Sequence, residues 1–310
     1  MATSGTFAWQ ITRDELIRGA LRIIGALDPQ ETPSSEDVST ATEALNMLLK
    51  SWNNTIVGLQ LWTVREATVF PQAGKVAYTL GTSDAPSAWS YTTVAVQSTA
   101  STGTTVQITA GIGAAGDYIG IKTGVSSQWT TIDTLSSSGT AHLAVSLSST
   151  ATLSANVWVF TNLMEYPVDI VHARVGASNG DDIELARMER EQYYDIYDKD
   201  RSGEPRRYYF DPQLSNPVFY TDYAPDDQNE LIRIVYRRPF EDAGDSTDTL
   251  DIPPEVTRAL KWNLASEIAP EYGVPPGTLS RIESKAAESL IQIRAIYGDR
   301  PRSTLPSAVI

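Results

Sequence analysis

The spacing of apolar residues changes twice along this chain of 310 residues, and that change constrains its fold more than any other feature. Near both chain ends, apolar side chains recur every three or four positions, which is typical of amphipathic helices. Between the ends they alternate with polar residues or form short runs, which is typical of strands. The sequence therefore predicts an α+β fold. Helices from both ends should bury their apolar faces against each other and form one discontinuous helical domain, with a large β region inserted between them.

Two helices are predicted at the N-terminal end. The first begins at Thr12, because Thr12 and Glu15 have the spacing of a capping box, in which each side chain accepts a hydrogen bond from the other residue's backbone N–H. Asp28-Pro29 marks its expected end, and the second helix follows Pro33. The link between the helices is short, so we expect an antiparallel pair. Their apolar faces are Leu16, Ala20, Ile24 and Leu27 in the first helix, and Val38, Ala41, Leu45, Leu48 and Trp52 in the second.

Two more helices are predicted at the C-terminal end. Residues 251–254 open the first, since aspartate can cap a helix and proline suits its first turn. This helix ends before Pro270. The second spans residues 278–297, with Gly298 as its C-cap. Their apolar faces are Val256, Leu260, Leu264 and Ile268 in the first, and Leu279, Ile282, Ala286, Leu290, Ile293 and Tyr297 in the second. We expect Leu16, Ile24, Leu45, Leu260 and Leu290 to share one core.

The β region divides by composition. Residues 82–161 are rich in Ser, Thr, Gly and Ala, and only Asp84, Asp117, Lys122 and Asp133 are charged among them. Short β runs recur there at turn spacing, which predicts an inserted sandwich or barrel of six or more strands. The domains expected along the chain are a helical hairpin at 1–64, a β-rich domain at 65–81 and 162–250, the insert at 82–161, a helical pair at 251–298 and an extended tail at 299–310.

Composition excludes several classes of chemistry. The chain has no cysteine, so disulfides, thiol catalysis and cysteine zinc sites are excluded, and two histidines are too few for a His-rich metal site. The net charge of -14 disfavours general affinity for nucleic acid. The N-terminus does not read as a signal peptide, and no apolar run is long enough to span a membrane. We therefore expect a soluble protein that is made in a cytoplasm.

The segment GASNG at residues 176–180 matches the G-x-S-x-G pattern of hydrolase nucleophile elbows. An elbow is followed by a helix, whereas residues 181–188 read as a strand. The hydrolase order also places the histidine after the serine, whereas His142 and His172 both precede Ser178. A hairpin turn explains the glycines better. Since no pair of carboxylates is marked out for glycoside hydrolysis either, no catalytic residue is predicted and the chain is not expected to be an enzyme.

Two groups of charged residues are candidate ligand sites. Residues 198–203 resemble the first half of a calcium loop, but the twelfth position is Tyr209 and no helix follows. We interpret this segment as a helix end and a polar turn, and we predict no metal or cofactor. The basic pairs Arg206-Arg207 and Arg237-Arg238, with Arg233, are expected on solvated strand faces or in salt bridges between subunits rather than at a DNA site.

The order of several segments resembles the head-to-tail adaptor family of short-tailed bacteriophages, also called packaged-DNA stabilisation proteins or tail accessory factors. The resemblance begins at residues 12–25 (TRDELIRGALRIIG) and continues through 41–52. It returns at 250–255 (LDIPPE) and 263–273 (NLASEIAPEYG), and segments 203–209 and 234–239 are similar to longer members. The insert at 82–161 departs from the shortest members.

The resemblance implies a structural protein of the virion neck and tail, assembled in the cytoplasm of the bacterial host. It implies a ring of twelve identical subunits below the portal protein, joined to a tail nozzle or tail fibre protein, with DNA passing through the channel without specific binding and no membrane involved. It also implies that the C-terminal tail reaches the portal or a neighbouring subunit. The tail residues expected to make these contacts are Arg300, Arg302, Leu305, Val309 and Ile310.

Two other functions remain open from the sequence. A virion binding module could contact host glycans through the β insert, and Trp89, Trp129 and Trp158 support this alternative, although tryptophan in a small sandwich is usually a core residue. A tail-associated hydrolase of the cell wall is the other alternative. A glycan array would test the first and a zymogram the second.

Overall fold

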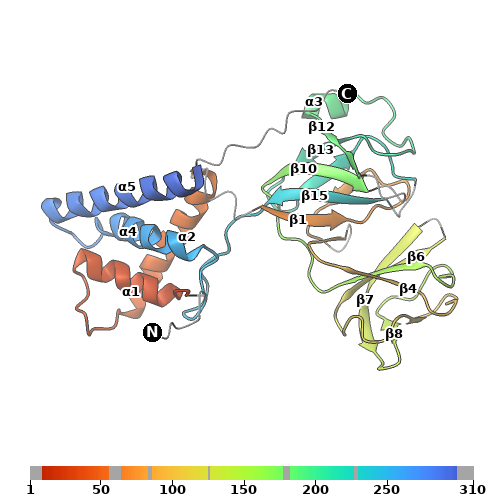
Figure 1. Ribbon diagram of the computed structural model, residues 1–310, viewed down its shortest axis with the longest axis horizontal. Helices are drawn as coiled ribbons and strands as arrows, with labels where there is room; N and C mark the ends of the chain where they lie inside the picture. Colours follow the sequence, from red (N-terminus) through yellow and green to blue (C-terminus); the bar gives the residue numbers. More distant parts are fainter. Residues whose placement is uncertain are drawn as a thin grey trace, which may run out of the picture. The chain divides into compact units, whose positions relative to one another are not determined.

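A computed structural model describes residues 9–55, 64–82, 86–124, 126–176, 182–226 and 230–298. The chain forms two compact units. The helical unit combines Met1–Thr63 with Pro239–Ile310, and the β unit is Val64–Arg238. Figure 1 shows that helices from both chain ends lie together in the first unit. This arrangement confirms the predicted α+β class, with a discontinuous helical domain and a large β insertion.

Four helices build the helical unit. They are α1 (Arg13–Ile24), α2 (Ser35–Thr55), α4 (Thr257–Ile268), which follows the 3-10 turn η2 (Pro254–Val256), and α5 (Pro276–Gly298). None of the helices in the described ranges is long and apolar enough to cross a membrane.

Local hydrogen bonds fix the ends of the N-terminal helices. The predicted capping box is present: Glu15 N–H donates to Thr12 Oγ1 at 3.3 Å, and Thr12 N–H donates to Glu15 Oε2 at 3.2 Å. Ser34 and Asp37 make the same reciprocal pair before α2. The first helix ends earlier than Asp28-Pro29, because Gly25 adopts the left-handed conformation (φ 77°) of a helix C-cap.

The apolar faces of all four helices meet in one core. The predicted positions Leu16, Ile24, Leu45 and Leu260 are buried there, whereas Leu290 is half-buried and packs against the same core. Helix α4 contacts each of the other three helices. The two chain ends therefore form a single hydrophobic core. The side chain of Tyr297 lies outside the described residues.

The segment that returns from the strands to α4 belongs to the helical unit, so the predicted β-domain boundary at residue 250 is wrong. Phe240, Ala243 and Leu250 are buried in the helical core. The chain therefore changes units at Arg238–Pro239. The prediction failed because residues 239–250 have no helical spacing and read as an extension of the strand before them.

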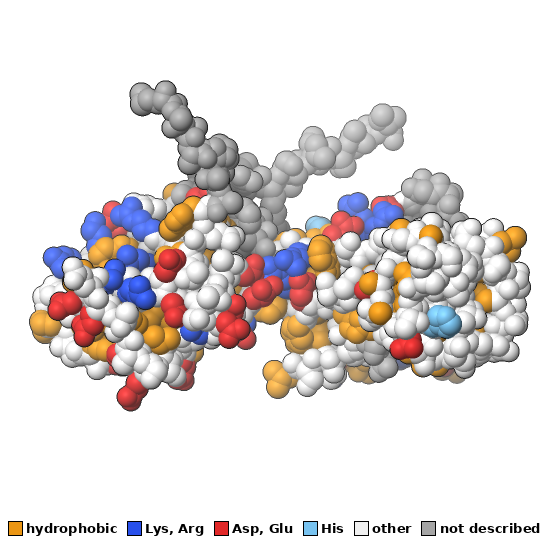
Figure 2. Space-filling model, turned by 90° about the horizontal axis from the view of Figure 1, so that it is seen from below, with side chains coloured by type: hydrophobic (Ala, Val, Ile, Leu, Met, Phe, Trp, Pro, Cys, Tyr) orange, Lys and Arg blue, Asp and Glu red, His pale blue; other side chains and the backbone are white. Residues whose placement is uncertain are grey.

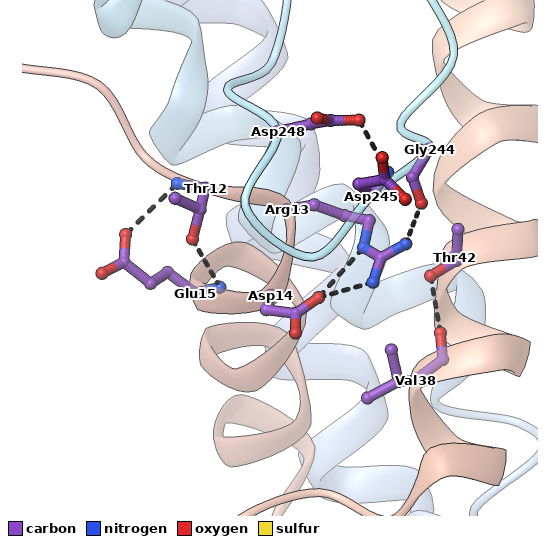
Figure 3. Close-up of polar contacts among 9 residues, drawn as sticks. All are labelled: Thr12, Arg13, Asp14, Glu15, Val38, Thr42, Gly244, Asp245 and Asp248. Carbon is purple, nitrogen blue, oxygen red and sulfur yellow. Dashed lines mark hydrogen bonds and ion pairs between the residues drawn. The ribbon is translucent and has the colours of Figure 1, made fainter.

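Polar contacts hold this return segment against α1 and α2 (Figure 3). The Arg13 guanidinium donates to the carbonyl of Gly244 and to the carboxylate of Asp14, and Arg13 N–H donates to the Asp248 carbonyl at 3.0 Å. On the side of α2, Ala243 N–H donates to Asn46 Oδ1 at 2.9 Å. These bonds satisfy backbone groups of an irregular segment that packs on the core.

The body of the β unit contains two sheets. The first has the strand order β11 (Asp182–Glu184), β10 (Asp169–Gly176), β15 (Leu231–Arg237), β1 (Val64–Val69) and β3 (Ser87–Ala88); the second has β12 (Ala186–Arg187), β13 (Arg207–Asp211), β14 (Val218–Thr221) and β2 (Ala77–Thr79). Buried residues of both sheets form one apolar cluster, as in a sandwich. The short helix α3 (Arg190–Tyr194) lies between β12 and β13 in the sequence. The strand predicted at 181–188 is divided, because β11 pairs in the first sheet and β12 in the second.

The insert is a six-stranded sheet with its own core. Its order is β4 (Thr92–Ala95), β9 (Asn156–Phe160), β6 (Tyr118–Thr123), β7 (Ser126–Leu135), β8 (Thr140–Leu143) and β5 (Thr105–Gln107). A register shift between Ile132 and Thr134 bends the sheet at β7. Beyond the edge strand β4, Gln97 N–H donates to the carbonyl of Gln107 in the opposite edge strand at 2.8 Å. The sheet thus curls toward a barrel. The predicted start at residue 82 is too early, because β3 pairs with β1.

Candidate binding site

The tail residues predicted to bind the portal lie outside the described residues. These are Arg300, Arg302, Leu305, Val309 and Ile310, all within residues 299–310. The structure therefore gives no geometry for them.

The G-x-S-x-G segment connects two antiparallel strands. Gly176 is the last residue of β10 and pairs with Asp182, the first residue of β11. Ser178 lies outside the described residues. The element after the segment is a strand, whereas a nucleophile elbow requires a helix.

The segment that resembles a calcium loop makes internal contacts. The Lys199 ammonium donates to the carbonyls of Ile196 at 2.8 Å and Tyr194 at 3.2 Å, and Asp200 N–H donates to Asp198 Oδ1 at 3.2 Å. Within the described ranges, no group of three or more His, Asp or Glu residues is placed to hold a metal ion.

Three of the arginines singled out in the sequence pair with carboxylates of the same chain. Arg206 pairs with Glu204 at 2.6 Å, Arg207 with Asp222 at 3.2 Å, and Arg233 with Asp182 at 3.1 Å. Of these carboxylates, Asp222 is buried. These ion pairs join neighbouring strands or turns within the β unit, so they neutralise a charge that DNA binding would require.

A cluster of tyrosines covers the outer side of the second sheet near α3. Tyr193, Tyr209 and Tyr220 have ring centroids between 4.8 and 5.7 Å apart, and the Lys199 ammonium lies 5.5 Å from the Tyr193 ring centroid. Tyr193 and Tyr209 are buried, whereas Tyr197 is fully exposed. Burial, and secondarily the neighbouring Tyr220, raise the pKa of Tyr193 to about 12 from an ordinary value of 10.0.

This shift predicts a loss of stability at alkaline pH. Between pH 10.0 and about 12 the unfolded chain releases the Tyr193 proton while the folded chain keeps it. The stabilisation is therefore complete below pH 10.0 and is lost as the pH rises toward the pKa of the folded state. Urea unfolding across this range should show a free energy of unfolding that falls with pH. Tyr193→Phe should reduce the slope, and the exposed Tyr197→Phe is the matched control. An equal slope in wild type and Tyr193→Phe would contradict the prediction.

The six-stranded sheet is joined to the first sheet by an aromatic junction, made of Phe70, Tyr91, Tyr118, Trp129, Trp158 and Phe160. Phe70 follows β1 directly, and its ring centroid lies 4.8 Å from that of Trp129 and 5.7 Å from that of Phe160. The Trp129 ring lies across Gly120, where a Cβ atom would come within 2.4 Å of a ring carbon. The insert is therefore packed onto the rest of the β unit through ring contacts.

Beside the aromatic junction lies an open pocket with a volume of about 240 Å³, called here the Trp89 pocket. Its lining includes Trp89, Tyr91, Thr92, Asp117, Thr161 and Asn162. It contains an aromatic side chain that is half exposed, one carboxylate and several neutral hydrogen-bonding groups. These are features of a site for a small polar ligand.

The three tryptophans that the sequence suggested for glycan binding differ in their exposure in the structure. Trp158 is buried, Trp129 is half-buried in the aromatic junction, and Trp89 is 50% exposed. Sequence reasoning did not single out Tyr91, Asp117 or Asn162 as a site. The one signal for it was that Asp117 is among the few charged residues of the insert.

Comparisons with known proteins identify no family. No family model matches the chain, and no curated protein matches it. Among solved structures, VP17, a capsid protein of bacteriophage P23-77, aligns with 63% of this chain and 76% of its own chain, at 10% identity and a TM-score of 0.12. A TM-score this low does not indicate a shared fold.

Proposed function

We propose that this chain is a structural protein of a bacteriophage virion and serves as the head-to-tail adaptor, forming a ring that joins the portal to the tail. One observation supports the proposal most directly. The segments that resemble adaptors, 12–25 and 41–52 at one end and 250–255 and 263–273 at the other, pack into one helical unit. Both chain ends close the helical unit, and the β unit, Val64–Arg238, is inserted between them in the sequence.

The charge distribution agrees with a channel protein. Figure 2 shows acidic and basic side chains interspersed on the helical unit, while the visible face of the β unit is mostly uncharged. The net charge is -14, and Arg206, Arg207 and Arg233 are paired with carboxylates. A surface of this kind repels phosphate on average, so DNA can pass along it without being held.

Reconstitution with the portal tests the proposal. Purified chain would be mixed with portal rings of the same phage, and the particles would be imaged by negative-stain electron microscopy. We expect extra density with the rotational symmetry of the portal on one face of the ring. Bare portal rings at a large excess of the chain would overturn the proposal.

A truncation after Gly298 tests the role of the tail in the same assay. If Arg300, Arg302 and Leu305 contribute to the portal contact, the truncated chain should occupy fewer rings at equal concentration, most clearly at low salt, where the ionic contacts of the full chain are strongest. Equal occupancy by both chains would assign the portal contact to the described part of the molecule.

A further inference from the structure

We propose that the Trp89 pocket is a binding site for a neutral saccharide. The inference is independent of the adaptor function, because it rests on the chemistry of the pocket alone. Three features support it: an exposed aromatic wall, a carboxylate with an oxygen open to the pocket, and a lining without lysine or arginine.

The aromatic wall is held in a defined position. The Arg65 guanidinium carbon lies 5.8 Å from the centroid of the Trp89 ring, and Arg65 forms an ion pair with Glu165. The Tyr91 ring is fixed by an edge contact with Phe70, at 5.2 Å between centroids. The indole still exposes half of its surface. An exposed, preoriented aromatic face can stack on the C–H face of a sugar ring, whose hydrogens carry partial positive charge.

Asp117 supplies the strongest polar group of the pocket. The residue is only 7% exposed. Its Oδ2 accepts a hydrogen bond from Ala114 N–H at 2.8 Å, and its own backbone N–H and carbonyl are bonded to Ala114 and Ile132. Its Oδ1 has no hydrogen-bond donor from any described residue. This oxygen is open to the pocket, so a sugar hydroxyl can donate a charge-assisted hydrogen bond to it.

The remaining lining selects against other ligands. Thr92, Thr161 and Asn162 are exposed side chains that can both donate and accept hydrogen bonds, as sugar hydroxyls can. A phosphate or another anion would find no Lys or Arg in the lining and would meet Asp117. A volume of about 240 Å³ suits one sugar ring rather than a large apolar ligand. An organic cation could use Trp89 and Asp117, but it would leave the hydroxyl and amide groups unused.

The full-length chain would first be screened on an array of bacterial surface oligosaccharides. The best neutral oligosaccharide would then be titrated against wild type, Trp89→Ala and Asp117→Asn, with binding followed by saturation-transfer NMR. Val145→Ala is the matched control, since it truncates an exposed apolar side chain of the same insert. A thermal unfolding curve of each protein would be recorded first, so that binding is compared only among variants that are folded.

We expect wild type and Val145→Ala to bind the oligosaccharide equally. Trp89→Ala and Asp117→Asn should each bind roughly tenfold more weakly or worse, as for the loss of a central contact. Three results would overturn the proposal: no oligosaccharide binds, Trp89→Ala binds as wild type does, or choline chloride binds in the pocket and the oligosaccharides do not. Failure of the portal assay with retained sugar binding would reject the adaptor function and leave this site intact.

Discussion

Replacing Leu260 by alanine should lower the free energy of unfolding of the helical unit by about 2–5 kcal/mol. Leu260 is fully buried in α4, and α4 contacts α1, α2 and α5. Truncation removes apolar surface from the core and leaves a cavity that helices from both chain ends line. Helix α4 is packed between three other helices, so the core cannot easily close that cavity.

Urea unfolding followed by far-ultraviolet circular dichroism measures this loss. Ile291→Ala is the matched control, because Ile291 lies in α5 with 65% of its surface exposed. The control should change the free energy of unfolding by less than about 0.5 kcal/mol. A similarly small effect of Leu260→Ala would mean that the two chain ends do not share a core in solution.

Phe70→Ala should destabilise the β unit by about 3–5 kcal/mol. Phe70 is 1% exposed and contacts Tyr91, Trp129, Trp158 and Phe160. Its removal takes the central ring out of the aromatic junction, so the loss of apolar burial is joined by the loss of edge and stacking contacts. The six-stranded insert should then separate from the first sheet before it loses its own core.

Tryptophan fluorescence reports this event directly, because Trp129 and Trp158 both border Phe70. Phe70→Ala should shift the emission to longer wavelength at low urea, ahead of the main transition. Phe70→Leu keeps most of the volume and should have a smaller effect. Leu153→Ala, on an exposed residue of the insert, is the control. Emission and stability that match wild type in Phe70→Ala would contradict the role assigned to the junction.

The helices of this protein could be predicted from the sequence because their signals are local. A cap and its partner lie three residues apart, as Thr12 and Glu15 do, and one face of a helix is defined by residues three or four apart. The buried positions Leu16, Leu45 and Leu260 follow from that spacing. Leu290 was placed less well, since the depth of an apolar residue on the outermost helix depends on which neighbours cover it.

The strands were less predictable, because alternation identifies the faces of a strand but not its partner. Residues 181–188 read as one strand, yet β11 pairs with β10 and β12 with β13, so the chain crosses between sheets there. Ser87–Ala88 read as part of the insert, yet they pair with β1. In both cases the deciding contacts join residues far apart in the sequence.

The sequence by itself determined that helices lie near both chain ends, that strands lie between them, and that the insert is poor in charge. It also excluded cysteine chemistry. Each of these features depends on composition or on residues close together in the chain. Only the tertiary structure decided that the return segment joins the helical core, and that Trp158 is buried while Trp89 lines a pocket beside Asp117. The physical reason is that burial depends on what packs against a side chain. For Trp158 that packing is set by the aromatic junction, which brings β1 and the insert together, whereas Trp89 lies outside the junction, beside Arg65.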